Sequence, residues 1–101
     1  SDHAMFSEED AAFSDRLYEG VHAHIEEIDA EIERYASGWS IGRIAKVDLS
    51  ILRIGVYEIL YERMIPVGAS VNEAVELGKE FGGDKSAGFI NGILGAVAKA
   101  H

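Results

Sequence analysis

Three side chains near the start of the sequence could bind a metal ion. His22, His24 and Glu26 supply imidazole and carboxylate groups, which are ligands for Zn²⁺. In a helix, His22 and Glu26 share one face, but His24 points elsewhere and no third ligand follows at a useful spacing. We therefore expect no metal site and no cofactor.

A second pair, Glu73 and Glu76, has the residue type that general acid–base catalysis uses. Carboxylates three positions apart on an exposed helix usually form a solvated stripe instead. The sequence also lacks cysteine, a glycine-rich phosphate loop after a strand and a nucleophile elbow. We expect that the protein is not an enzyme.

Lys85 and Ser86 open the last helical pattern of the chain. The N-terminus of a helix presents backbone N–H groups that favour phosphate, and a lysine beside it adds positive charge. These residues are therefore candidates for binding a phosphate group. The alternative is that Lys85 is an ordinary exposed lysine.

The composition indicates one globular domain with an acidic surface. The chain has 101 residues, 48% of them hydrophobic, and a net charge of −9. Residues 1–33 hold eleven acids and one base, whereas the remainder holds seven acids and eight bases. Such a chain is a poor nucleic-acid binder as a whole, because cations drive that affinity. Nothing marks secretion or a membrane span, so we expect a cytoplasmic protein.

The first long element is predicted to be one helix from Phe13 to Tyr35. Its apolar residues recur every three or four positions, and acids fill the other face. Ser7 can cap the start, and Ser37-Gly38 can end the helix.

The rest of the chain predicts a short turn and three further helices. Asp48 can cap a helix that runs to about residue 63, and Pro66 stops it. Ser70, with Glu73 three residues on, can cap the next helix, and Asp84 the last. No alternating strand pattern is present, so the fold class is all-α, with four to five helices.

Glycines inside these helices each cost about 1 kcal/mol, which close helix packing can offset. They are Gly55, Gly78, Gly88, Gly92 and Gly95.

Several strings together resemble the NusB family of bacterial transcription antitermination factors. They are IAKVDLSILRIGVYEIL at residues 44–60, Ile65-Pro66, VNEAVELGKEFG at residues 71–82 and FINGIL at residues 89–94. Order and spacing agree over about 60 residues strongly and about 90 loosely. Together these strings are specific, although each one alone is weak.

The resemblance implies a NusB-like helical bundle that binds the ribosomal protein NusE and the boxA element of nascent ribosomal RNA. It implies that the ring of Phe89 contacts RNA and that the phosphate near Lys85 and Ser86 is that of RNA. It also implies that Asp48 contacts NusE. It also implies a structural role for Arg53. We interpret the matching Asn72, Glu73 and Asn91 as hydrogen-bonded framework.

One part of the family pattern is not recognised here. NusB-like proteins usually begin with an arginine-rich helix and a second helix, and the pattern from Phe13 to Tyr35 resembles the family's third helix. We interpret residues 1–5 as an expression remnant or disordered start, and residues 6–101 as the C-terminal part of the family fold. Without the basic arm we expect weak boxA binding by this chain alone. Apolar surface left uncovered would favour a homo-oligomer.

Two alternatives remain open. A NusB-like domain also serves as an accessory RNA-binding module in some ribosomal RNA cytosine methyltransferases. A helical self-association module, with the acidic helix as a solvated face, is the other alternative.

Overall fold

All regular structure in the described part of the chain is helical. The computed structural model describes residues 17–62 and 64–101. A helical segment spans residues 17–23. It is followed by α2 (Ile25–Tyr35), the 3-10 turn η2 (Ile41–Arg43), α3 (Lys46–Tyr61), α4 (Val67–Phe81) and α5 (Ser86–Ala100). The predicted all-α bundle is confirmed.

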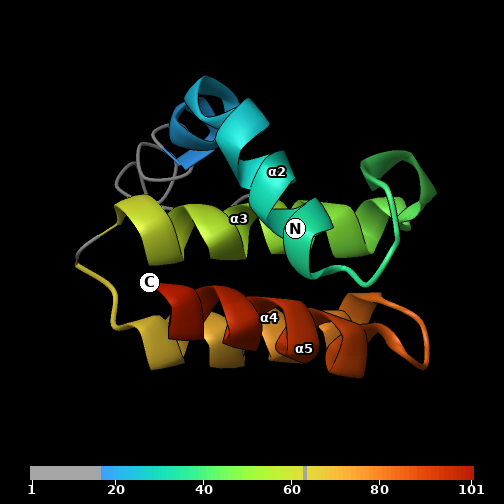
Figure 1. The fold of residues 1–101 in the computed structure, drawn as a ribbon. Helices are drawn as coiled ribbons and strands as arrows, with labels where there is room; N and C mark the ends of the chain where they lie inside the picture. The colour runs from blue at the N-terminus through green and yellow to red at the C-terminus, as the bar shows by residue number, and fades with distance from the viewer. Residues whose placement is uncertain (1–16, 63) are drawn as a thin grey trace, which may run out of the picture.

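The helices form two layers, one of α4 and α5 and the other of α3 with α2 across it (Figure 1). α4 and α5 lie side by side, and α3 packs against both of them. α2 lies obliquely across α3 and also contacts α5. Among residues 17–62 and 64–101, no helix is both long and apolar enough to cross a bilayer.

The core lies where α2, α3 and α5 meet. Each of these helices contributes aliphatic side chains with no exposed surface, and burying one such side chain contributes about 1.5–3 kcal/mol. They are Ile28, Ile32, Leu52, Val56, Ile90, Leu94 and Val97. On α4 the inward positions are instead small, Ser70, Ala74 and Gly78, which lets this helix approach its neighbours closely.

The helical glycines fall into two groups. A Cβ added to Gly55 would lie 2.6 Å from Leu94 Cδ1, and one added to Gly78 would lie 2.8 Å from Ile90 Cδ1. Close helix packing therefore explains these two glycines, as predicted. The same explanation is wrong for Gly88, Gly92 and Gly95, since a Cβ there would meet open space.

The predicted single helix from Phe13 to Tyr35 is interrupted at His24, while Phe13 and the Ser7 cap lie outside the described residues. At the break, the His24 ring stacks on Tyr61 with their centroids 4.0 Å apart. Gly20 leaves room for the Tyr57 ring, which a side chain there would strike. Packing against α3 thus explains the bend that periodicity did not predict.

Three predicted helix caps are wrong, because each helix begins elsewhere. α3 begins two residues before Asp48, and α4 begins at Val67, three residues before Ser70. Pro66 fits that start because its φ is −59° and a helix start needs no N–H from it. α5 begins at Ser86, with Lys85 rather than Asp84 in the cap position. Asp48 and Ser70 instead lie buried inside the first turns of α3 and α4.

An ion pair joins α2 to α3. Arg53 donates two hydrogen bonds to the Asp29 carboxylate, from Nε at 2.9 Å and from Nη2 at 2.8 Å. Two parallel bonds of this kind fix geometry better than a single contact. The structural role implied for Arg53 is confirmed.

Candidate nucleic-acid interface

A tight turn after α2 brings Trp39 to the surface. Ser37 and Gly38 adopt positive φ values of 52° and 92°, which reverse the chain as a helix-ending turn does. The turn is held by the Trp39 N–H, which donates to the Ala36 carbonyl at 3.1 Å. The Ile41 N–H then donates to Glu33 Oε2 at 2.8 Å. Trp39 is 51% exposed, so part of this residue is accessible to a ligand.

Phe89 lies in the first turn of α5 and meets Trp39 across the surface. The two rings have centroids 6.5 Å apart and are inclined at 74°, an edge-to-face arrangement. Phe89 is half-buried and packs on the core, which holds its ring in place. The two aromatic residues come from segments fifty positions apart in the sequence.

Hollows lie on both sides of this aromatic pair. The larger has a volume of about 610 Å³. It is lined by Trp39, Arg43, Ile44, Ala45, Asp48, Gly83, Lys85, Ser86 and Phe89. The smaller, of about 280 Å³, lies on the far side and includes Gly88 and Gly92. These two glycines have no side chains, so the space beside Phe89 stays open.

Two cations stand at the larger hollow. Lys85 occupies the cap position of α5 and is exposed, and Arg43 ends η2 and is also exposed. Ser86 is buried, and its hydroxyl accepts a hydrogen bond from the Gly83 N–H at 2.8 Å. This bond holds the turn before α5. Of the two predicted phosphate-binding residues, Lys85 and Ser86, only Lys85 is exposed to solvent.

Asp48 lies in the larger hollow and is only 9% exposed. It is the third residue of α3 and makes no side-chain cap bond. Its Oδ1 atom is buried without a hydrogen-bond partner in the described structure. The structure therefore brings Asp48 together with Lys85, Ser86 and Phe89, although Asp48 is far from these three residues in the sequence.

The side chains first considered for catalysis or metal binding lie elsewhere. His22 lies beside the Tyr18 ring, whereas His24 stacks on Tyr61. Within residues 17–62 and 64–101, no group of acidic, histidine or cysteine residues is arranged to hold a metal ion. Glu73 and Glu76 are exposed, and Glu76 pairs with Lys79 at 3.0 Å.

The framework interpretation of Asn72, Glu73 and Asn91 is wrong. All three are exposed, because the register of α4 and α5 turns Ala74 and Ile90 inward instead. Exposed polar side chains do not need the internal partners that buried ones require.

Glu58, on α3, is the one carboxylate in the described residues with a clearly shifted pKa. Burial raises its pKa, the Ser70 hydroxyl opposes this, and the Glu73 and Glu62 carboxylates raise the pKa further. The Ser70 hydroxyl lies near Glu58, but their geometry falls outside that of a regular hydrogen bond. Glu58 does not line the hollows beside the aromatic pair. We therefore expect its raised pKa to affect the stability of the fold rather than ligand binding.

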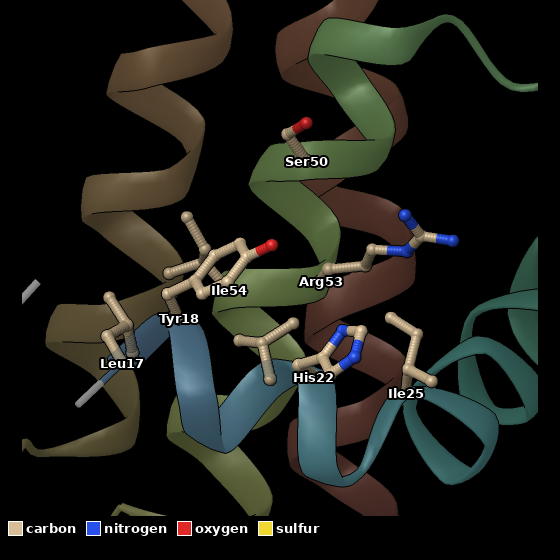
Figure 2. A pocket seen from close by; sticks show the side chains of 8 residues that line it. Leu17, Tyr18, His22, Ile25, Ser50, Arg53 and Ile54 are labelled. Atoms are coloured by element: carbon tan, nitrogen blue, oxygen red, sulfur yellow. The ribbon is translucent and has the colours of Figure 1, made fainter. Parts of the chain in front are cut away.

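A third hollow, of about 610 Å³, lies between residues 17–23 and α3. Figure 2 shows Tyr18 and His22 from the first segment around it, with Arg53 and Ile54 of α3 on the other side. Tyr18 is 72% exposed and Ile54 is 36% exposed. Most of its lining residues are apolar, and Arg53, the one arginine among them, is paired with Asp29.

Sequence reasoning missed Trp39 and Arg43. Both lie in the connection between two helices, where periodicity gives no information about side-chain direction. The available signal was the position of the single tryptophan directly after a Ser-Gly turn, since a large aromatic residue in an exposed loop often marks a binding surface.

Comparison with known proteins gives a consistent result. The model of the NusB family matches residues 1–99. The transcription antitermination protein NusB of Myxococcus xanthus is 47% identical over 88 residues, which cover 87% of this chain and 63% of that protein. NusB of Acetivibrio thermocellus is 46% identical over 93 residues, covering 92% and 64% respectively. The chain thus spans less than two thirds of these relatives.

Solved structures agree with the fold. A Thermotoga maritima NusB crystal structure superposes with a TM-score of 0.91 at 35% identity, covering 97% of this chain and 69% of that one. A chain in a crystal structure of the antitermination factors NusB and NusE with double-stranded RNA gives a TM-score of 0.86 at 30% identity. That match covers 99% of this chain and 74% of the other.

Proposed function

The chain belongs to the NusB family, and we propose that it acts as a transcription antitermination factor that binds NusE and boxA RNA. The single observation that supports the RNA part best is the pairing of the exposed Trp39 with the half-buried Phe89, with Arg43 and Lys85 beside them. Unpaired bases stack on aromatic side chains, and cations neutralise the phosphates between them. This function places the protein in the cytoplasm, where transcription occurs.

In this proposal each predicted RNA residue has a distinct task. The Phe89 ring stacks on one base, which contributes about 1–3 kcal/mol. Lys85 neutralises a phosphate at the start of α5. Ser86 contributes indirectly, because its hydroxyl holds the Gly83 N–H and so fixes the turn that carries Lys85. Binding is non-catalytic, in keeping with relatives that are named as antitermination proteins.

The proposed partner is NusE, which forms a complex with NusB and double-stranded RNA in one of the similar crystal structures. The resemblance assigns Asp48 to that contact, and this assignment stays a prediction. We propose that this chain alone binds boxA weakly, because its net charge of −9 opposes nucleic acid. NusE would then supply the surface that completes the RNA site.

Replacing Phe89 tests the RNA part of this function. Phe89→Leu keeps an apolar side chain on α5 but removes the stacking ring, so boxA affinity should fall about 5- to 150-fold in the presence of NusE. Phe81→Leu is the matched control, because Phe81 is 61% exposed at the end of α4, away from the aromatic pair. Fluorescence anisotropy with labelled boxA RNA measures both. Equal affinities of the two variants would argue against the proposed site.

A self-association module is the second candidate, and the exposed apolar residues favour it. Tyr18 and Ile54 border the hollow beside residues 17–23, and Val47 and Phe81 border another between α3 and α4. Light scattering separates the candidates: the antitermination factor forms a one-to-one complex with NusE, whereas the module forms a homodimer that NusE leaves intact.

A further inference from the structure

One side of α3 carries an apolar surface that the proposed antitermination function does not use. Two hollows border it, one beside residues 17–23 and one between α3 and α4, and Ser50 lines both. Figure 2 shows Ser50 and Ile54 on successive turns of α3 beside the first of these hollows. Val47 and Ile54 are both exposed. We call the surface of Val47, Ser50 and Ile54 the α3 face; grouped apolar residues of this kind typically bind another segment of chain.

The chain enters the described structure at the edge of the α3 face. Leu17, the first described residue, lines the hollow beside the N-terminal helical segment. Residues 14–16 separate it from Phe13, and a connection of three residues can join two helices. Their sequence, Ser-Asp-Arg, begins with two residues that favour turns. The preceding segment, residues 6–13, can therefore turn back along α3.

We propose that residues 6–13 form a short helix that packs on the α3 face, so that the chain covers this face with its own N-terminal segment. The proposal places a turn at residues 14–16, where apolar periodicity alone would continue one helix. A segment of eight residues is too short to be a stable helix by itself. Its helical structure therefore depends on this packing.

The large side chains of the segment have the same spacing as those of the α3 face. Phe6 and Phe13 are seven residues apart, as are Val47 and Ile54. In a helix, seven residues make about two turns and span about 10.5 Å. When the segment lies alongside α3, Phe6 therefore meets Val47 at the same time as Phe13 meets Ile54.

The polar groups of the two surfaces also match. Ser50 lies in the middle of the α3 face, three residues after Val47, and Glu9 lies three residues after Phe6. A hydroxyl can donate a hydrogen bond, and a carboxylate accepts one. Lys46 is exposed and is the only charged residue that lines the hollow between α3 and α4. Its charge attracts the same carboxylate.

The connection and the charge both favour this segment over a second copy of the chain. A segment tied to the face by three residues has an effective concentration of about millimolar. A second copy at about micromolar concentration competes poorly with it. Two copies also repel each other, because each has a net charge of −9. Docking of residues 6–13 thus leaves less apolar surface for a self-association module.

A disulfide test is clean because the sequence has no cysteine. The double variant Glu9→Cys with Ser50→Cys keeps both phenylalanines of the segment. It should form an intramolecular disulfide on mild oxidation, since linked Cα atoms lie within about 7 Å of each other. Glu9→Cys with Lys99→Cys is the control, because Lys99 is exposed in the last turn of α5, and it should stay reduced. Non-reducing gels and intact mass separate a linked monomer from a linked dimer.

A second measurement uses the rate at which iodoacetamide alkylates the single variant Ser50→Cys. Adding Phe6→Ser removes one anchor of the segment and should raise this rate at least about fivefold, because it makes the face more often accessible. Met5→Ser is the matched control: Met5 adjoins Phe6 in the sequence but lies outside the proposed helix. It should leave the rate unchanged. Circular dichroism melts establish that each variant folds.

Three results would overturn the inference. A linked dimer in place of the linked monomer would assign the α3 face to a second copy. Equal linking, or no linking, of the two cysteine pairs would show that the segment has no fixed place on α3. Alkylation of Ser50→Cys that is fast in the chain alone and slow only after NusE is added would assign the face to NusE. The proposed RNA binding is tested separately at Phe89.

Discussion

Asp48 and Glu58 are two acids on α3 that burial affects in different ways. Asp48 lies in the first turn, at the helix end whose dipole favours an anion. Glu58 lies in the last turn, where the dipole opposes an anion and two other carboxylates are close. Residue type alone could not separate them, because the difference lies in what each side chain faces after folding.

Glu58 should make the stability of the protein depend on pH. Burial raises its folded-state pKa above the ordinary value of 4.5, so the folded chain binds this proton more tightly than the unfolded chain. The contribution of Glu58 to the free energy of unfolding is therefore fully present below that ordinary value, and it is lost as the pH rises through the raised pKa. Glu58→Gln should be more stable than the parent at neutral pH, and the difference should shrink in acid. Thermal melts of both chains between about pH 4 and pH 8 measure it; a difference that does not change with pH would contradict the explanation.

At the scale of elements, the sequence predicted which segments are helical but not where they begin. The apolar stripe of α2 and the stop at Ser37-Gly38 were both found by pattern. Asp48 and Ser70 were assigned as caps because their residue types are typical of caps, yet both are buried inside helices. The sequence cannot reveal this, because tertiary packing rather than capping sets the start of α3 and of α4.

The glycines of α3 and α5 provide a matched test of close packing. Gly55→Ala gains about 1 kcal/mol of helix propensity, but its Cβ would lie within 3.4 Å of three atoms of the buried Leu94. Overpacking costs about 1–3 kcal/mol, so we expect a net loss of stability. Gly95→Ala meets open space and should gain up to about 1 kcal/mol. Urea unfolding of both variants measures the two free energies, and a stabilised Gly55→Ala would show that Leu94 has room to move.

At the scale of the whole molecule, the candidate site combines the connection after α2 with the start of α5, two segments that lie far apart in the sequence. Motif matching found Phe89, Lys85 and Ser86, which lie close together on or beside α5. It could not find Trp39 and Arg43, because a turn with two positive φ values directs them toward α5. Acids dominate the outer face of α2, whereas Arg43 and Lys85 border the aromatic pair. The net charge therefore describes the molecule poorly at the place where RNA would bind.

This uneven charge leads to a prediction about salt. If Arg43 and Lys85 each neutralise one phosphate, the logarithm of the association constant for single-stranded RNA should fall with the logarithm of salt concentration with a slope of about −1.4. Arg43→Gln and Lys85→Gln should each reduce the steepness by about 0.7. Lys99→Gln is the control, because Lys99 is exposed in the last turn of α5, at the opposite end from Lys85. Anisotropy titrations at several salt concentrations give the slopes. If Lys99→Gln changed the slope as much as Lys85→Gln, the attraction would come from the overall charge of the chain, and the two cations beside the aromatic pair would have no special part in binding.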